Sequence, residues 1–582
     1  MTSLEAKASY DRAYMAQPPT PNDATTWRHR LRKTRDTGIE STSEGAEGIG
    51  RFLVYAALGV GVGVVVVGIE WLAIEQMLHA LIDAPLWVQV LAPGVGLALT
   101  ALILRLGWNT ESSTSDAYVE AFHGSTELEP RRLGPKLAAA LTTVGFGGAA
   151  GLEGPAVFAG ANLGQWLGRR KLKVLGTRNH RLLLAAGAAA AVAAVFRAPA
   201  TGVLFALETP FRRDIAKHAL IPALVASAAS YITFVIILGP GRLLFIQPAE
   251  VPLTDEVIGA VVIGLFAGIA ARGIAALFHF AKDAGKVAPI SVRLPVAAAS
   301  LAAAVLITDQ LVDIPVTLGP GAESIVDIVL NPTISVWVIM ALFVIRAIAS
   351  SVTLGAGGVG GVFIPLVVQG LLLGRIVEVI FDAPSNGLYP VIGLAAVLGA
   401  GYRTPLAAVM FVAETTGRAE FVIPALLATA VSQSLMGDVS VSTVQVDERG
   451  GQLEARLRMS TEQVTIPSSD TVARTKTLLE VIDEIDEKSG LGVIAVCDAE
   501  DGSYCGLLVL ADIAPALMDH GMEAQVHLIM RDIPAVTQQT PALEAARAMN
   551  DYNTAAVAVL DAEGRPIGVV TATSIAGLND LQ

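Results

Sequence analysis

Long runs of apolar residues alternate with short polar segments through the first three quarters of the chain. A helix that crosses a membrane needs about 20 mostly apolar residues. Five runs reach this length and predict membrane-crossing helices: 51–74, 86–106, 220–239, 257–278 and 335–355. Other apolar segments are shorter and are interrupted by Gly and Pro. Interrupted helices persist at membrane depth where they are buried in protein or line a wet cavity, so this pattern favours a transporter over a bundle of equal spans.

The composition agrees with an integral membrane protein. The 582 residues are 53% hydrophobic and 16% charged, whereas soluble domains carry about 25% charged residues. A net charge of −13 argues against a nucleic-acid partner. Residues 1–50 form a polar tail without the apolar segment of a signal peptide. Basic patches at 27–35 and 168–173 predict cytoplasmic flanks, hence a multi-pass protein of the plasma membrane with both termini in the cytoplasm.

The apolar region contains an internal repeat. Residues 185–208 align with 391–414 without a gap, which pairs Gly187 with Gly393, Arg197 with Arg403, Pro199 with Pro405 and Glu208 with Glu414. We therefore expect two membrane halves, 51–240 and 255–440, joined by a linker at 241–254. The second half is expected to be inverted, because a shared site at mid-membrane takes a broken helix from each half.

A second repeat lies in the hydrophilic C-terminal part. Residues 493–517 resemble 556–578, and each stretch reads as strand, turn, strand and helix start, preceded by an amphipathic helix. The pattern predicts two small α/β modules, 459–530 and 531–582, that follow a linker at 441–458.

The cysteines also lie in this part of the chain. Cys497 and Cys505 are the two cysteines of the sequence, and they form neither a disulfide framework nor a metal-binding spacing. Because Cys497 ends an apolar strand-like run, we expect it in a buried core.

One carboxylate stands alone in the membrane region. Glu153 is the sole ionisable residue between Lys136 and Arg169, within a run of Gly and Ala. A carboxylate at membrane depth costs roughly 2.5–3.5 kcal/mol or more, so by default it is functional and faces a cavity. Pro155 fits the first turn of a helix. The stretch "GLEGP" therefore predicts a helix N-terminus that is aimed at an anion, with a carboxylate able to act as that anion.

The second half supplies a similar loop without the acid. In "GGVGGVFIP" (357–365), the backbone N–H groups of Val362 and Phe363 are candidate anion donors, as is the N–H of Gly154 in the first loop. Glycines also serve close helix packing in membranes, and for the glycines alone this reading is preferred. An unpaired glutamate between two matching loops favours an anion path.

These motifs resemble the CLC family of chloride channels and chloride/proton exchangers. The resemblance rests on "GLEGP" (151–155), on "GGVFIP" (360–365), on Lys136 and on the repeated "FRAPATGVLFALE" and "YRTPLAAVMFVAE" stretches. The C-terminal modules are similar to the CBS pair of many members. The resemblance implies a multi-pass α-helical membrane protein with two inverted repeats of broken helices and a cytoplasmic α/β CBS pair. It also implies a homodimer with one anion pathway per subunit, in which Glu153 is the gating glutamate that competes with chloride.

The chain departs from the family in its first anion loop. The family pattern is Gly-Ser-Gly-Ile-Pro, and the matching stretch here is "STSDAY" (113–118). Thr114 stands where the family has the serine whose hydroxyl contacts chloride, with Ser113 beside it. Asp116 adds an acid. The same residues also suit an ordinary helix N-cap.

Two further departures concern the inner end of the pathway. Ser442 stands at the family's inner tyrosine, which predicts a less closed cytoplasmic end. Thr209 stands at the internal glutamate of proton-coupled members, which favours weak or absent proton coupling. Glu208 and Glu414 are expected to be structural because they recur in both halves.

The CBS modules keep half of a nucleotide-binding motif each. Asp512 follows Gly506 in the first module without the family's Thr, and Thr571 follows Gly568 in the second without its Asp. An adenine nucleotide such as ATP or AMP is a possible ligand, and a packing or dimerisation role is at least equally compatible. No cofactor is required by the sequence.

Three classes of function remain open from the sequence. The first is an anion channel or an exchanger that uses another proton route. The second is an intramembrane enzyme that uses Glu153, although the spans hold no His cluster, cysteine or Gly-x-Ser-x-Gly motif. The third is a membrane-anchored sensor whose CBS pair is the active part. We expect the first: transport of chloride or similar small anions.

Overall fold

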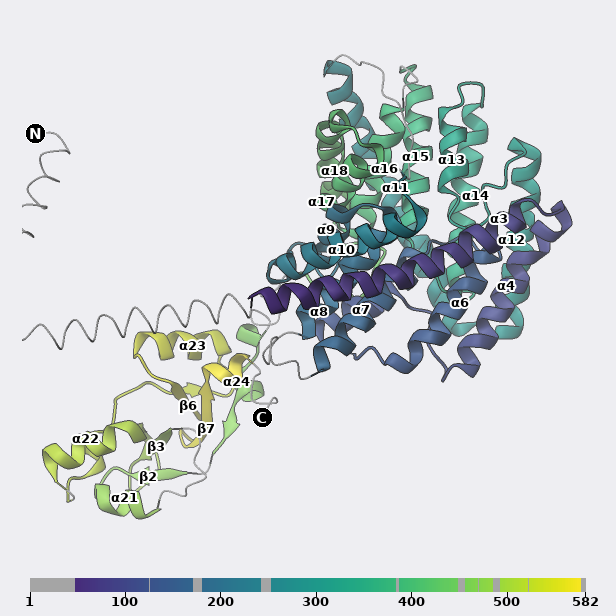
Figure 1. Ribbon diagram of the computed structural model, residues 1–582. Helices are drawn as coiled ribbons and strands as arrows, with labels where there is room; N and C mark the ends of the chain where they lie inside the picture. Colours follow the sequence, from purple (N-terminus) through teal and green to yellow (C-terminus); the bar gives the residue numbers. More distant parts are fainter. Residues whose placement is uncertain are drawn as a thin grey trace, which may run out of the picture. The chain divides into compact units, whose positions relative to one another are not determined.

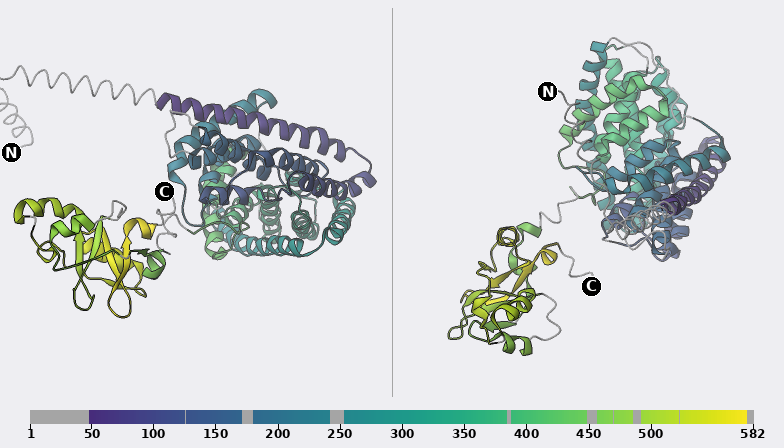
Figure 2. Two further views of the ribbon diagram at one scale, coloured as in Figure 1. Left: turned by 90° about the horizontal axis from the view of Figure 1, so that it is seen from below. Right: turned by 60° about the vertical axis from the view of Figure 1, so that its left-hand side comes forward.

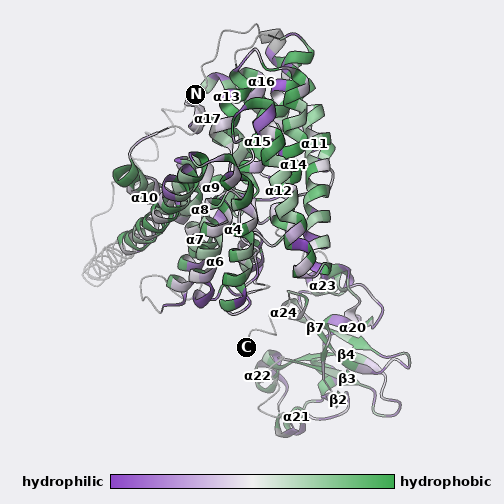
Figure 3. Ribbon diagram, turned by 90° about the vertical axis from the view of Figure 1, so that its right-hand side faces the viewer, coloured by the Kyte–Doolittle hydropathy of each residue, from purple (hydrophilic) through white to green (hydrophobic). Residues whose placement is uncertain are grey.

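The computed structural model describes residues 48–124, 126–170, 180–241, 253–383, 387–447, 456–468, 470–484, 492–521 and 523–576 (Figure 1). The basic patch at 27–35 lies outside these residues, as do residues 242–252 of the first expected linker and 448–455 of the second. The chain divides into two compact units, Met1–Val446 and Asp447–Gln582. The helices of the first unit are predominantly hydrophobic (Figure 3).

The first half of the helical unit opens with a long helix that lies along its flank (Figure 2). The elements of this half are the helix Gly48–Ile82, within which Trp71–Leu78 is π-helical (η1) and His79–Ile82 is α3, then α4 (Leu86–Leu106), α5 (Ser115–His123), η2 (Pro130–Arg132), α6 (Leu133–Gly145), α7 (Glu153–Arg169), α8 (His180–Phe196), α9 (Pro199–Glu208), η3 (Lys217–Ala219) and α10 (Leu220–Leu238).

The second half ends in the same succession of elements as the first: two α-helices, a shorter α-helix, a 3-10 turn and a last α-helix. Its elements are α11 (Leu253–Val287), α12 (Ile290–Val312), α13 (Ala322–Leu330), α14 (Val336–Gly355), α15 (Phe363–Ile380), α16 (Leu388–Tyr402), α17 (Pro405–Thr416), η4 (Ala419–Phe421) and α18 (Val422–Met436). In the part of the chain that is described, eight helices are long and apolar enough to cross a membrane.

All five expected spans are found within these eight helices. The remaining three are Ile290–Val312, Phe363–Ile380 and Ala419–Met436. Phe363–Ile380 has most of its surface buried inside the protein rather than facing lipid. Its glycines and proline, which disguised it as a broken segment, serve contacts with neighbouring helices.

The repeated glycines let two helix pairs approach closely. In the first half a Cβ on Gly187 of α8 would lie 1.9 Å from the carbonyl oxygen of Gly160 on α7. In the second half a Cβ on Gly393 of α16 would lie 2.3 Å from the carbonyl oxygen of Gly370 on α15. Both distances are far below contact distance, so glycine is required at the paired positions. The sequence repeat is thus a repeat of helix packing.

The repeated Glu residues cap each other's helices. The Glu208 carboxylate, at the end of α9, accepts hydrogen bonds of 3.1 and 2.8 Å from the N–H groups of Leu406 and Ala407 at the start of α17. The Glu414 carboxylate of α17 accepts bonds of 2.9 and 2.8 Å from the N–H groups of Ala200 and Thr201 at the start of α9. Each acid therefore satisfies backbone donors that have no partner within their own helix. This geometry agrees with the expected structural role of both residues.

The second unit contains two small sheets. The elements are α20 (Thr461–Val464), β1 (Ile466–Pro467), β2 (Thr471–Ala473), α21 (Leu478–Glu484), β3 (Val493–Cys497), β4 (Tyr504–Val509), α22 (Leu510–His520), η5 (Val526–Leu528), β5 (Val536–Thr537), α23 (Ala542–Asp551), β6 (Ala556–Leu560), β7 (Pro566–Thr571) and α24 (Ala572–Ala576). The sheet orders are β2-β3-β4 and β1-β7-β6-β5.

A segment from outside each α/β repeat pairs at the edge of its sheet. Strand β1 pairs antiparallel with β7, with Ile466 opposite Val569. In return, Arg531 pairs with Leu507 of β4. The two α/β repeats therefore form one interlocked unit, and β1 belongs to the sheet of the second module although it lies within the range expected for the first.

Candidate functional site

The two glycine-rich loops lie side by side. Gly151 and Gly361 form an isolated antiparallel bridge in which each N–H donates to the other's carbonyl oxygen, over 3.0 and 2.8 Å. Helix α7 begins at Glu153 and α15 begins at Phe363, so each helix starts shortly after its bridge residue. Two helix N-termini therefore meet here, and their first N–H groups have no intrahelical partners. Such a pair of N-termini is suited to hold an anion.

The Glu153 side chain is fully buried at this meeting point. Its Oε1 accepts a hydrogen bond of 2.7 Å from the N–H of Phe363, whereas Oε2 is buried without a hydrogen-bond partner. Among the described residues, no lysine or arginine acts on this carboxylate. The carboxylate therefore occupies a backbone anion site and is not held by a basic side chain.

The residues around the carboxylate leave no room for larger side chains. A Cβ on Gly154 would lie 2.9 Å from the backbone nitrogen of Gly361 and 2.4 Å from Oγ1 of Thr114. Val362 is the N-cap residue of α15, and it is buried together with Phe363. The sequence-predicted residues Thr114, Gly154, Val362 and Phe363 thus lie together around Glu153.

The first anion loop places its hydroxyls differently from the expectation. The Thr114 hydroxyl donates to the carbonyl oxygen of Gly360 over 3.1 Å, so its proton is already used within the protein. The carbonyl oxygen of Ser113 accepts a hydrogen bond from Nζ of Lys136. Ser115, the first residue of α5, has a buried hydroxyl that makes no hydrogen bond with another described group. The buried hydroxyl of this loop that has no partner among the described residues is thus that of Ser115, one residue beyond Thr114.

Tyr402 is a second site residue that the sequence reasoning missed. It ends α16, its side chain is buried, and its ring packs edge-on against Phe205 at 5.3 Å between centroids. Its ring also lies 6.4 Å, between centroids, from that of Phe363, whose N–H binds the Glu153 carboxylate. The one available signal was the repeat, which pairs Tyr402 with Phe196 and so adds a hydroxyl in the second half alone.

The segment after α18 lies against this tyrosine. Nε2 of Gln445 donates to the carbonyl oxygens of Tyr402 and Thr209 over 2.9 and 2.8 Å. Ser442 is buried, and its hydroxyl has no hydrogen-bond partner among the described residues. The Thr209 hydroxyl donates to the carbonyl oxygen of Phe205 over 2.6 Å within α9. The compact helical unit therefore continues through Val446, and Thr209 has its proton engaged in its own helix.

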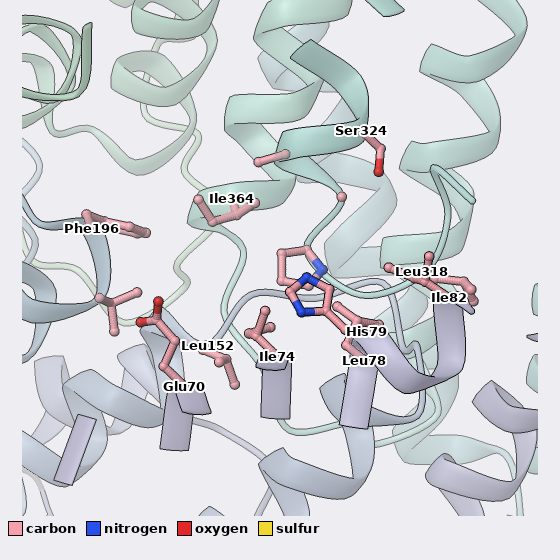
Figure 4. A pocket seen from close by; sticks show the side chains of 14 residues that line it. Glu70, Ile74, Leu78, His79, Ile82, Leu152, Phe196, Leu318, Ser324 and Ile364 are labelled. Atoms are coloured by element: carbon pink, nitrogen blue, oxygen red, sulfur yellow. The ribbon is translucent and has the colours of Figure 1, made fainter. Parts of the chain in front are cut away.

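A cavity of about 120 Å³ adjoins the site (Figure 4). Leu152 and Ile364, the chain neighbours of Glu153 and Phe363, form part of its wall together with the π-helical segment η1. Figure 4 shows Glu70 next to Leu152 at one end and His79 next to Leu78 further along. π-Helical segments are rare, and they occur frequently at functional sites. The cavity therefore reaches the chain neighbours of Glu153 and Phe363.

The two nucleotide candidates in the second unit are engaged elsewhere. The Asp512 carboxylate accepts hydrogen bonds of 2.8 and 3.1 Å from the guanidinium of Arg531. The Thr571 hydroxyl accepts a hydrogen bond of 3.0 Å from the N–H of Ser574 at the start of α24. The Asp512 carboxylate is thus paired with an arginine, and the Thr571 hydroxyl caps a helix. These contacts do not fit those that an adenine nucleotide would make through its ribose and phosphate groups.

Family models match most of the chain. The voltage gated chloride channel model matches residues 44–437, and the CBS domain model matches residues 525–578. The chain is 30% identical over 372 residues to a putative chloride channel protein, ClcB-like, of Ralstonia nicotianae, covering 62% of this chain and 85% of that protein. It is 27% identical over 348 residues to the H⁺/Cl⁻ exchange transporter ClcA of Salmonella paratyphi A, covering 55% of this chain and 70% of that protein.

Solved structures share the fold. A CLC-type fluoride/proton antiporter aligns with a TM-score of 0.59 and 22% identity, covering 69% of this chain and 98% of that one. A eukaryotic CLC transporter aligns with a TM-score of 0.59 and 17% identity, covering 90% of this chain and 98% of that one. The fold is accordingly that of two inverted repeats of broken helices, followed by an α/β CBS pair.

Proposed function

Because the chain belongs to the voltage-gated chloride channel (CLC) family, we propose that it carries chloride or a similar small anion through one pathway in each subunit of a homodimer, gated by Glu153. The observation that supports this most directly is the position of the Glu153 carboxylate. It is buried and bonded to the N–H of Phe363, which is a site that an anion would fill equally well.

The gating step follows from competition for backbone donors. With Oε1 on the N–H of Phe363, the carboxylate blocks the place where the two helix N-termini converge. Its other oxygen has no hydrogen-bond partner among the described residues, so within that part of the chain the departing side chain gives up its bond to the N–H of Phe363. The adjoining cavity offers the space to move into. An incoming anion replaces the carboxylate at the same N–H groups. These helix N-termini therefore have a negatively charged acceptor both when the carboxylate is bound and when the transported anion is bound.

The hydroxyls of Ser115 and Tyr402 complete the anion site in this proposal. Both are buried, and the serine hydroxyl has no other hydrogen bond among the described residues. Hydroxyl protons and backbone N–H groups are neutral donors, which bind an anion without making it a fixed ion pair and so let it leave. Thr114, Ser113 and Gly154 shape the loop around this place, and Ser442 lies buried in the segment whose Gln445 bonds to Tyr402.

We propose that proton coupling is weak or absent. Thr209 cannot accept and release a proton near neutral pH as a carboxylate does, and its hydroxyl is bonded to its own helix. The alternative is a chloride/proton exchanger with another proton route, a class to which the similar ClcA protein belongs by its description. The proposal places both termini in the cytoplasm, because the basic flank that includes Arg169 and Arg170 ends α7.

Reconstitution of the full chain in liposomes, with chloride and pH electrodes in parallel, tests the proposal. We expect chloride efflux without uphill proton movement, and a changed flux for Glu153→Gln, which keeps the shape and removes the charge. Glu420→Gln, an exposed acid in η4, is the matched control. Proton movement driven by a chloride gradient would instead establish an exchanger. Absence of anion flux from the folded protein would overturn transport and favour the sensor function.

A further inference from the structure

Asp116 is an acid next in sequence to a residue of the proposed anion site. It lies in the first turn of α5, directly after Ser115, whose hydroxyl we assign to the anion site. Its side chain is mostly buried, with 19% exposed. A negative charge at this position repels an approaching anion unless it is compensated.

Lys282 compensates this charge from the other half of the protein. Its Nζ lies 3.3 Å from Oδ2 of Asp116 and donates a hydrogen bond to it. Lys282 belongs to α11, in the second membrane half, whereas Asp116 belongs to the first. The lysine side chain is 33% exposed, so the pair sits at the border between buried protein and an accessible surface.

The other charges near this place do not cancel Asp116. Glu120 lies one turn further along α5, and Asp116, Glu111 and Lys136 all act on it electrostatically. Lys136 is itself engaged with the carbonyl oxygen of Ser113 and lies over the ring of Phe158. Arg132, a further cation near Lys136, pairs with Glu129 over 3.0 Å, so Lys282 is the cation that forms an ion pair with Asp116 among the described residues.

We propose that the Lys282–Asp116 ion pair sets the charge at the mouth of the anion site and thereby controls how readily an anion enters. The pair acts through the electrostatic field and does not touch the transported ion. This inference rests on the proposed anion transport. In this proposal the positive charge of Lys282 matters only while Asp116 is charged. The two residues can therefore be tested together in a double-mutant cycle.

The test compares Lys282→Met, Asp116→Asn and the double variant in chloride efflux from liposomes. We expect Lys282→Met to lower the flux on the order of tenfold, because an uncompensated charge a few ångströms from the path raises the energy of an entering anion. We expect Asp116→Asn to match or exceed the unmodified protein. The double variant should recover to within about twofold of Asp116→Asn, since no charge is then left to compensate. Lys286→Met is the matched control, because Lys286 lies one turn further along α11 and pairs with exposed Asp283 at 2.9 Å.

A second variant separates charge from folding. In a chain whose two native cysteines are replaced by serine, Lys282→Cys removes the charge, and a methanethiosulfonate reagent with an ammonium group restores it on the folded protein. Flux should rise after the cationic reagent and stay low after a neutral reagent. The inference is overturned if Lys282→Met transports chloride within about twofold of the unmodified protein, or if the double variant is as slow as Lys282→Met. Absence of flux in the unmodified protein would count against the proposed function instead.

Discussion

Gly361 approaches Glu153 so closely that a Cβ at this glycine would lie 2.1 Å from Oε1 of the carboxylate. The same Cβ would lie 2.6 Å from the backbone nitrogen of Gly154, which cannot rotate away. The loop of the second half is therefore fitted to the acid of the first, and the two halves share one site.

Gly361→Ala should damage this site without unfolding the protein. The methyl group displaces both the carboxylate and any anion from the N–H of Phe363, so chloride affinity should fall on the order of tenfold, or about 1.4 kcal/mol. Titration calorimetry of the purified protein with chloride measures it. Gly61→Ala is the control, because a Cβ at Gly61 meets no atom within 4 Å. Equal chloride affinity in Gly361→Ala would show that the anion binds elsewhere.

Tyr402→Phe should weaken anion binding while preserving the packing. Phenylalanine keeps the ring contacts with Phe205 and Phe363 and removes only the hydroxyl. A hydrogen bond to a charged group contributes about 1.5–3 kcal/mol, so the half-saturating chloride concentration should rise roughly tenfold or more. Flux as a function of chloride concentration measures this value. Tyr231→Phe on α10 should leave it unchanged, and an unchanged value in Tyr402→Phe would remove the phenol from the site.

Much of the fold was predictable from the sequence because it depends on local patterns. Uninterrupted apolar runs gave the five expected spans, and the gap-free repeat gave the two halves. The span Phe363–Ile380 was not identified, since it is buried in protein and its apolar residues follow directly on the glycine-rich loop. The length and hydropathy of a segment identify helices that contact lipid. They identify helices that lie inside the protein poorly.

The site itself was only partly predictable. Glu153 stood out because a lone acid in an apolar stretch has a large energetic cost, which a sequence shows directly. Ser115 and Tyr402 did not, because nothing in the sequence tells which of three neighbouring hydroxyls will remain without a partner. Thr114 lost that role to a contact with Gly360, which is 246 positions away in the chain. Partners at such separations are decided by the tertiary fold.

Loss of either reciprocal cap should destabilise the protein. Glu208→Ala leaves two N–H groups at the start of α17 without acceptors, the buried one of Ala407 and the partly buried one of Leu406, and this should cost about 1–2 kcal/mol. Glu414→Ala should have a similar effect at the start of α9. Thermal unfolding in detergent would show lowered midpoints for both variants, whereas Glu420→Ala, at an exposed position, should not change the midpoint. An unaltered midpoint for Glu208→Ala would refute the capping role.

The two cysteines of the C-terminal unit should differ in reactivity. Cys497 ends β3 and is buried, in agreement with the expectation from the sequence, whereas Cys505 in β4 is partly exposed. Burial raises the pKa of the Cys497 thiol, with a smaller contribution from Cys505. The thiolate is the nucleophile, so a raised pKa leaves less of the reactive form near neutral pH.

Iodoacetamide labelling followed by peptide mass spectrometry tests this difference. At about pH 8, Cys505 should be alkylated on the order of tenfold faster than Cys497, and the two rates should converge in guanidinium, which removes the burial. The rate at Cys497 should keep rising with pH beyond the usual range of a thiol, because a raised pKa moves its titration to higher pH. Equal rates in the folded protein would contradict both the burial of Cys497 and the direction of its pKa shift.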